Sequence, residues 1–197
     1  MVSTRRKVKE EKEKYEASTW GVYDALRKSH PRAMNSLEGA MITAVSVLVS
    51  QYIKSVTTGK PFDLDTQEIM VMTTVSITLI TPTLLSFYGF LGEMKFNKLL
   101  TLFIDQVVFS PIFTTMILSY ISILKVILTK GEMVPFHELT AVVQGMLPIL
   151  PGIIAKGWCF WVPVRLGVIY MAPEAYHILI GNVCSFVWNI VFMLILE

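Results

Sequence analysis

Long apolar runs separated by short charged links dominate the chain from residue 37 onward. Residues 69–91 and 175–196 contain no Asp, Glu, Lys or Arg, and in residues 99–124 the only such residue is Asp105. The hydrocarbon core of a bilayer needs roughly 20 helical residues at about 1.5 Å each. Because these runs also lack the polar face of a soluble helix, each predicts a transmembrane helix, and we expect the three to lie roughly antiparallel.

A shorter apolar run at residues 39–53, extendable to Leu37, predicts a first span of marginal length. Lys54 at its end can lengthen this span by reaching back to the interface. Together the runs predict an all-α fold, a polytopic transmembrane helical bundle of about four spans. Residues 20–197 form a single bundle domain in this prediction.

Residues 139–173 combine apolar stretches with Pro148, Pro151, Pro163 and Pro173. Two apolar pieces of about 17 residues flank Lys156, each short for a full span. Proline removes helical hydrogen bonds, and irregular backbone at membrane depth must be covered by protein or water. We therefore expect a proline-broken helical segment before the last span, interrupted near residues 148–157 and crossing once at most.

The residues ahead of the first run are polar. Residues 1–14 mix basic and acidic side chains and lack the apolar core of a secretory signal. We expect residues 1–19 to form a charged, solvated tail, and a contact with lipid headgroups is the alternative. Trp20, Tyr23 and Leu26 then predict a short amphipathic helix at the membrane interface, ended or restarted at Pro31.

Composition narrows the function classes. Apolar residues make up 53% of the chain and charged residues 16%, and a soluble domain has roughly 25% charged residues. The net charge of +2 is too small to indicate a nucleic-acid partner. Cys159 and Cys184 lie in apolar runs and predict small buried hydrophobes. Since His30, His137 and His177 stand far apart and no catalytic motif occurs, we expect no metal, no cofactor and no enzymatic activity.

Polar side chains inside the apolar runs form three stripes at helical spacing. Thr74, Thr78 and Thr81 make the first, Gln106, Ser110 and Thr114 the second, and Asn182, Ser185 and Asn189 the third. One interpretation is hydrogen bonding between packed helices, at roughly 1 kcal/mol or less per contact. The other interpretation is a water-filled lumen.

Asp105 carries the sharpest prediction. A charged Asp at membrane depth costs on the order of 3 kcal/mol on insertion scales, so it needs a partner or a polar cavity. We expect its side chain to point into the bundle, toward Arg165, Lys156 or a cavity between the Thr74 and Asn182 stripes. Pro111 has no N–H to donate to the carbonyl of Val107, so we expect a free acceptor about one turn from Asp105.

Four patches of the chain resemble the family of small peroxisomal and mitochondrial membrane proteins typified by the twenty-two-kilodalton peroxisomal membrane protein and Mpv-seventeen. The patches contain, in order, Trp20, Tyr23, Leu26, His30 and Pro31; Pro82, Phe87 and Tyr88; Asp105, Gln106 and Pro111; and Trp161, Pro163, Tyr170, Pro173, Trp188 and Asn189. Their order and spacing match over residues 20–190. The chain departs from the family at Val47, Arg165, Val168, Ile169 and His177, where the family usually has Asp, Gln, Asn, Phe and Arg.

The resemblance implies an organellar membrane channel or pore-like protein, weakly selective for small solutes or ions and supporting organelle homeostasis. A structural or assembly membrane protein without transport activity is the alternative. The resemblance also implies the mitochondrial inner membrane, or else the peroxisomal membrane. The expected partners are the lipid bilayer, small solutes or ions, and further copies of the chain in a homo-oligomer.

Overall fold

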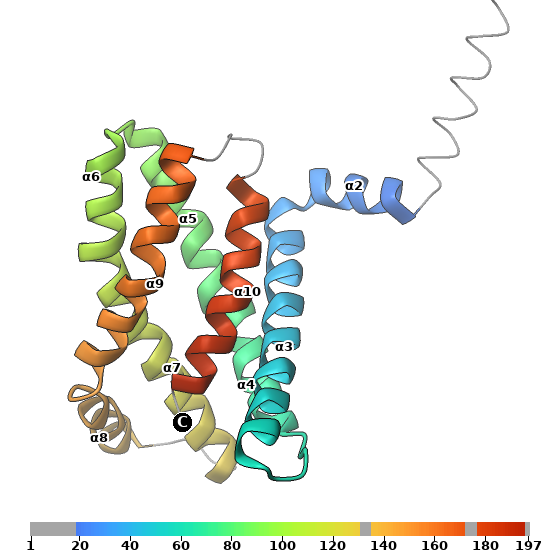
Figure 1. Cartoon of the computed structure of the whole chain (residues 1–197), viewed down its shortest axis with the longest axis vertical. Coiled ribbons are helices and arrows are strands. Elements are labelled where there is room, and N and C mark those ends of the chain that lie inside the picture. The colour runs from blue at the N-terminus through green and yellow to red at the C-terminus, as the bar shows by residue number, and fades with distance from the viewer. Residues whose placement is uncertain (1–18, 131–134, 172–176, 196–197) are drawn as a thin grey trace, which may run out of the picture.

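The computed structural model describes residues 19–130, 135–171 and 177–195, and over these residues the chain is a helical bundle without strands (Figure 1). By length and composition, three helices are suited to cross a membrane: Pro31–Thr58, Thr66–Met94 and Lys98–Thr129. They are α3 (Pro31–Thr58), α4–η1–α5, and most of α6–η2–α7. Helices α9 (Leu150–Met171) and α10 (His177–Ile195) run beside them, so the expected all-α transmembrane bundle is confirmed.

The first long helix extends well beyond the apolar run that predicted it. Pro31 stands at the start of α3, where the absent N–H is not needed, and Gly59 ends the helix with a φ of 68°. The buried face of α3 contains Thr43, Ser46 and Ser50 among its members, which lower the apparent hydrophobicity of the helix. The hydroxyl groups of Ser46 and Ser50 are nevertheless paired, because they donate to the carbonyls of Ile42 and Val47 of the same helix. Hydropathy alone therefore underestimated the length of this span.

A short helix, α2 (Thr19–Ser29), precedes α3 and points away from the side of the bundle at one end (Figure 1). Tyr23 donates a hydrogen bond to Glu38 of α3, and Arg27 lies 3.4 Å from the same carboxylate. The predicted restart at Pro31 is confirmed. Residues 1–18 of the expected tail lie outside the described residues.

Two of the long helices change from α to π geometry just before a proline. In η1 (Ser76–Ile80), between α4 (Thr66–Val75) and α5 (Thr81–Met94), the N–H of Thr81 bonds to the carbonyl of Ser76. In η2 (Ile104–Phe109), between α6 (Lys98–Phe103) and α7 (Ser110–Lys130), the N–H of Ser110 bonds to the carbonyl of Asp105. Both ladders are one residue wider than in an α-helix, a geometry that often marks functional sites.

Residues 139–173 are broken where the first prolines stand. The helix α8 (Phe136–Met146) ends before three turn residues, 147–149, and α9 begins at Leu150. The interruption near Pro148 is thus confirmed, but it does not reach Gly157. Pro151 fits the first turn of α9, and Pro163 is accommodated inside the helix. Pro173 lies outside the described residues.

The centre of the bundle is apolar. Val47, Val71 and Val75 are almost fully buried and pack with residues of the later helices. The other buried members of this core are Met72, Leu118, Ile121, Leu150, Ile153, Phe192 and Met193. Val47, at a position where the resembled family usually has Asp, is 0% exposed within this apolar core.

Candidate intramembrane polar site

Five side chains from α5, η2 and α9 meet in a polar cluster, called here the Asp105 cluster: Tyr88, Asp105, Gln106, Trp158 and Arg165. Tyr88, Asp105 and Arg165 each lie about two helical turns, or roughly 10 Å, from a helix end. Figure 1 shows those ends, of α5, α6 and α9, at the same end of the bundle as α2. The cluster therefore lies inside the bundle, nearer the α2 end.

Asp105 is the centre of this cluster and is only 5% exposed. Tyr88 donates its hydroxyl to Oδ1 (3.0 Å), and the side-chain amide of Gln106 donates to Oδ2 (2.9 Å). Arg165 places Nε 3.3 Å from Oδ2 and donates from its terminal nitrogen to the Tyr88 hydroxyl. Asp105 thus points into the bundle, and of the three surroundings expected for it, Arg165, Lys156 or a polar cavity, the structure shows Arg165.

Aromatic rings flank the guanidinium of Arg165. Its central carbon lies 4.7 Å from the ring centre of Tyr88 and 5.8 Å from that of Trp161. Cation–π contacts of this kind are worth roughly 0.5–2 kcal/mol and strengthen when water is excluded. The positive charge is therefore stabilised by a carboxylate and by two aromatic faces.

The π turn and the following proline together place Trp158. The N–H of Ser110 is used by the carbonyl of Asp105. At π spacing the carbonyl of Gln106 faces Pro111, which has no N–H. Trp158 replaces the missing backbone donor, because its indole N–H donates to the Gln106 carbonyl at 2.7 Å. The prediction of an acceptor freed by Pro111 was made at α spacing and pointed to Val107, whereas the bonded carbonyl belongs to Gln106.

Two polar atoms of the cluster have no hydrogen-bond partner. They are the side-chain oxygen of Gln106 and Nε of Arg165, and both atoms are buried. Nε lies near the carboxylate, but its N–H is not directed at an oxygen. A dry, unpaired buried group costs about 1–3 kcal/mol, so a small molecule that bonds to both atoms would stabilise the cluster.

The remaining predicted residues lie elsewhere. Lys156 is exposed on α9, and no contact joins it to Asp105 in the described part of the chain. Thr74 and Thr78 are exposed, and Thr78 donates to the carbonyl of Thr74 (2.7 Å). Asn182 is exposed and Asn189 half-buried on α10. The structure thus brings together Asp105, Gln106 and Arg165, and it does not bring the Thr74 and Asn182 stripes to them.

The structural-motif residues have separate roles. Pro82 and Pro111 follow the π turns, and Trp161 contacts Arg165. Trp188 packs beside Phe160 and Trp161, with ring centres 5.3 and 6.1 Å away. His30 is exposed at the junction of α2 and α3.

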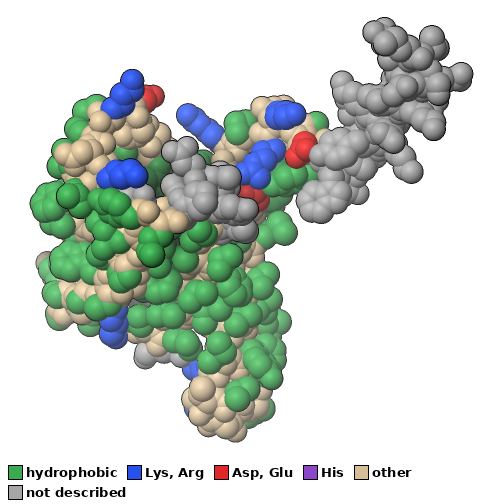
Figure 2. Space-filling view, turned by 45° about the horizontal axis from the view of Figure 1, so that its top comes forward, with side chains coloured by type: hydrophobic (Ala, Val, Ile, Leu, Met, Phe, Trp, Pro, Cys, Tyr) green, Lys and Arg blue, Asp and Glu red, His purple; other side chains and the backbone are tan. Residues whose placement is uncertain are grey.

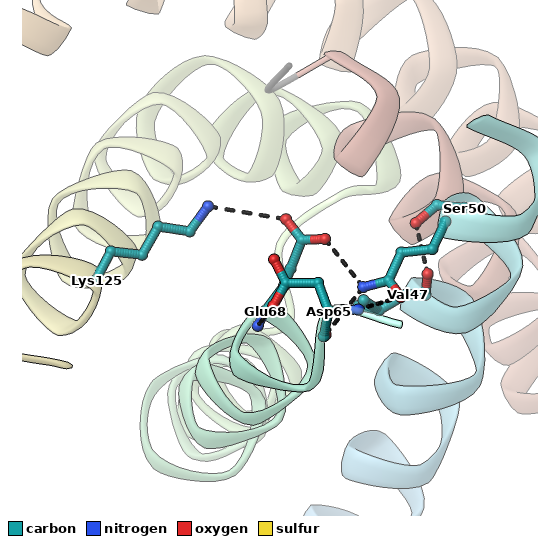
Figure 3. Close-up of polar contacts among 6 residues, drawn as sticks. Val47, Ser50, Asp65, Glu68 and Lys125 are labelled. Carbon is teal, nitrogen blue, oxygen red and sulfur yellow. Dashed lines mark hydrogen bonds and ion pairs between the residues drawn. The ribbon is translucent and has the colours of Figure 1, made fainter. Parts of the chain in front are cut away.

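A second polar group was not predicted from the sequence. This Glu68 cluster consists of Gln51, Asp65, Glu68 and Lys125, and Figure 3 shows it between α3, α4 and α7. Gln51 donates to the backbone carbonyl of Asp65 (3.1 Å) and to Glu68 (3.2 Å), and Lys125 lies 3.8 Å from Glu68. Asp65 also caps α4 by accepting from the N–H of Glu68 (2.8 Å). The Glu68 cluster as a whole joins the start of α4 to the two neighbouring helices, α3 and α7.

Within the described residues no group of three or more His, Cys, Asp or Glu side chains is arranged to hold a metal ion. Comparisons of the chain with protein-family models, with curated proteins and with solved structures find no match.

Proposed function

We propose that this membrane protein is an organellar channel or pore-like protein for small solutes or ions, whose path passes the Asp105 cluster. The observation that carries the proposal is the incomplete hydrogen bonding of a charged cluster inside an apolar bundle. Ionisable groups at membrane depth most often mark a solute or ion path. The two unpaired atoms support the proposal, because a small molecule that bonds to both would complete the hydrogen bonding of the cluster.

The surface of the bundle supports the membrane setting. Figure 2 shows hydrophobic side chains over its flank and several Lys and Arg side chains at the end that carries α2. Large apolar residues such as Ile112, Met116 and Val183 are exposed. An apolar flank between charged ends matches a lipid bilayer, which has an apolar hydrocarbon core between two polar headgroup layers.

The resemblance to the peroxisomal and mitochondrial family supports an organellar address. We place the protein in the mitochondrial inner membrane, with the peroxisomal membrane as the alternative. Organelle fractionation with marker proteins tests this address, and recovery in the endoplasmic reticulum alone would refute both.

Reconstitution into liposomes tests the channel itself. The purified protein should raise the flux of small solutes or ions above that of protein-free vesicles, and Asp105→Asn should change that flux. Glu93→Gln is the matched control, because it also removes a carboxylate but at an exposed position outside the cluster. Wild-type vesicles as tight as protein-free ones to every probe would refute the proposal.

A structural or assembly role is the second candidate, and one observation favours it. Asp105 and Arg165 neutralise each other, and the apolar core around Val47 packs the centre of the bundle. Under this alternative the cluster only fixes α9 against α5 and η2. Asp105→Asn would then lower stability, and no variant would alter permeability.

A further inference from the structure

We infer that the Asp105 cluster accepts a neutral hydroxyl group, from water or a small polyol, and disfavours bare ions. This inference rests on the proposed channel function and names its substrate class.

The charges of the cluster cancel. Asp105 faces Arg165, Tyr88 and Gln106, and Arg165 faces Asp105, Tyr88 and Trp161. Among the described residues, no further Lys, Arg, Asp or Glu side chain contacts either member of the pair. A cation arriving here meets a carboxylate that already accepts hydrogen bonds from Tyr88 and Gln106 and that lies beside a fixed positive charge. An Arg in such a position is a barrier to cations in narrow polar pathways.

The unused atoms comprise one acceptor and one donor. Gln106 must turn its NH₂ group toward Asp105, because a carboxylate only accepts, and this leaves its side-chain oxygen as the free acceptor. Nε of Arg165 is the free donor. Both Gln106 and Arg165 reach the same carboxylate oxygen, Oδ2, so the two free atoms both lie near that oxygen.

The free donor and the free acceptor together limit which ligands fit the site. An ammonium group donates but cannot accept from Arg165, and a carboxylate accepts but cannot donate to Gln106. A hydroxyl group does both, and so does water. The nearby rings of Tyr88, Trp158 and Trp161 offer apolar faces for the C–H groups of a polyol.

Solute and ion fluxes in the same proteoliposomes test this inference. Stopped-flow light scattering would follow osmotic water flow and glycerol entry, and reversal potentials in a KCl gradient would follow ions. We expect water or glycerol permeability at least about fivefold above protein-free vesicles, with no measurable K⁺ or Cl⁻ conductance. Water flow without glycerol entry would assign the site to water, and both flows would assign it to polyols as well.

Two variants localise the effect. Gln106→Leu removes the free acceptor and should lower the solute flux about tenfold, while Gln67→Leu, at an exposed glutamine outside the cluster, should not. Arg165→Gln leaves Asp105 unneutralised and should introduce a K⁺ conductance. Thermal unfolding of each variant identifies any that fails to fold, and the wild-type fluxes still test whether hydroxyl compounds pass and ions do not.

The outcomes separate the inference from the function beneath it. Ion conductance without water or glycerol flux would overturn the inference and leave the channel proposal standing. The absence of every flux would overturn the channel proposal and the inference with it. Unchanged solute flux in a folded Gln106→Leu variant would remove the site from the path and overturn the inference alone.

Discussion

Asp105 is held inside the bundle by three side chains, those of Tyr88, Gln106 and Arg165. Arg165 was predictable as the partner of Asp105. A carboxylate inside the membrane is costly unless a cation pairs with it, and the apolar runs contain few Lys or Arg residues. Tyr88 was not predictable, because a tyrosine among apolar residues has the same sequence signature as any interfacial aromatic. Trp158 was hidden for another reason, since its acceptor exists only because a π turn precedes Pro111.

Removing the charge of Asp105 should destabilise the protein. In Asp105→Asn the guanidinium of Arg165 loses its carboxylate inside the bundle. Breaking a fully buried pair costs about 3–5 kcal/mol. Since the Arg165 side chain is 30% exposed, we expect the smaller loss of about 2–3 kcal/mol.

Thermal or denaturant unfolding in detergent micelles measures that loss. The double variant Asp105→Asn with Arg165→Gln should recover much of the stability, because it strands no charge. Equal stabilities of wild type and Asp105→Asn would show that the pair contributes nothing to the fold.

Helix packing at the element scale depends on close approach as much as on apolar area. Gly39 of α3 lies against the start of α5, and a Cβ at this position would come within 2.7 Å of the Thr81 hydroxyl oxygen. Run lengths predicted α4–η1–α5, α6–η2–α7 and α10 well, because stretches almost free of charge leave few alternatives, but they underestimated α3. They could not predict the Glu68 cluster, whose bonds from Gln51 to Asp65 and Glu68 arise only when α3 and α4 fold against each other.

Gly39→Ala should push α3 away from α5. We expect a loss of about 1–2 kcal/mol, because Thr81 is β-branched and must leave its preferred rotamer. Gly89→Ala is the matched control, since nothing lies within 4 Å of its added Cβ, and it should be neutral or slightly stabilising. Adding Thr81→Ala should restore the stability of the Gly39 variant, and failure to do so would place the strain elsewhere.

Tyr23 of α2 is joined to α3 by its hydrogen bond to Glu38. Its hydrogen bond to Glu38 raises the pKa of the Tyr23 phenol further above the neutral range, where the phenol is protonated and can donate. Tyr23→Phe should free α2 from α3 and speed its cleavage by a protease in mild detergent. Tyr52→Phe, a change at an exposed tyrosine of α3, should leave the cleavage rate unchanged.

At the scale of the whole molecule, a polar cluster stands toward each end of an apolar centre. The Asp105 cluster joins α5, η2 and α9, and the Glu68 cluster joins α3, α4 and α7. Between them lies the core around Val47, Val71 and Val75. Sequence patterns predicted the bundle and its buried carboxylate, whereas the division into two clusters depends on which helices become neighbours.

The continuous course of α9 has a consequence for sidedness. An even number of crossings would leave both ends of the bundle domain in one compartment. Because α9 runs from the end opposite α2 back toward it, α10 finishes at the far end from α2 (Figure 1). We therefore expect a reporter placed ahead of α2 and one placed after α10 to face opposite compartments, with membrane-impermeant labelling of intact organelles reaching only one of them. Labelling of both reporters, or of neither, would mean that α9 folds back without traversing the bilayer.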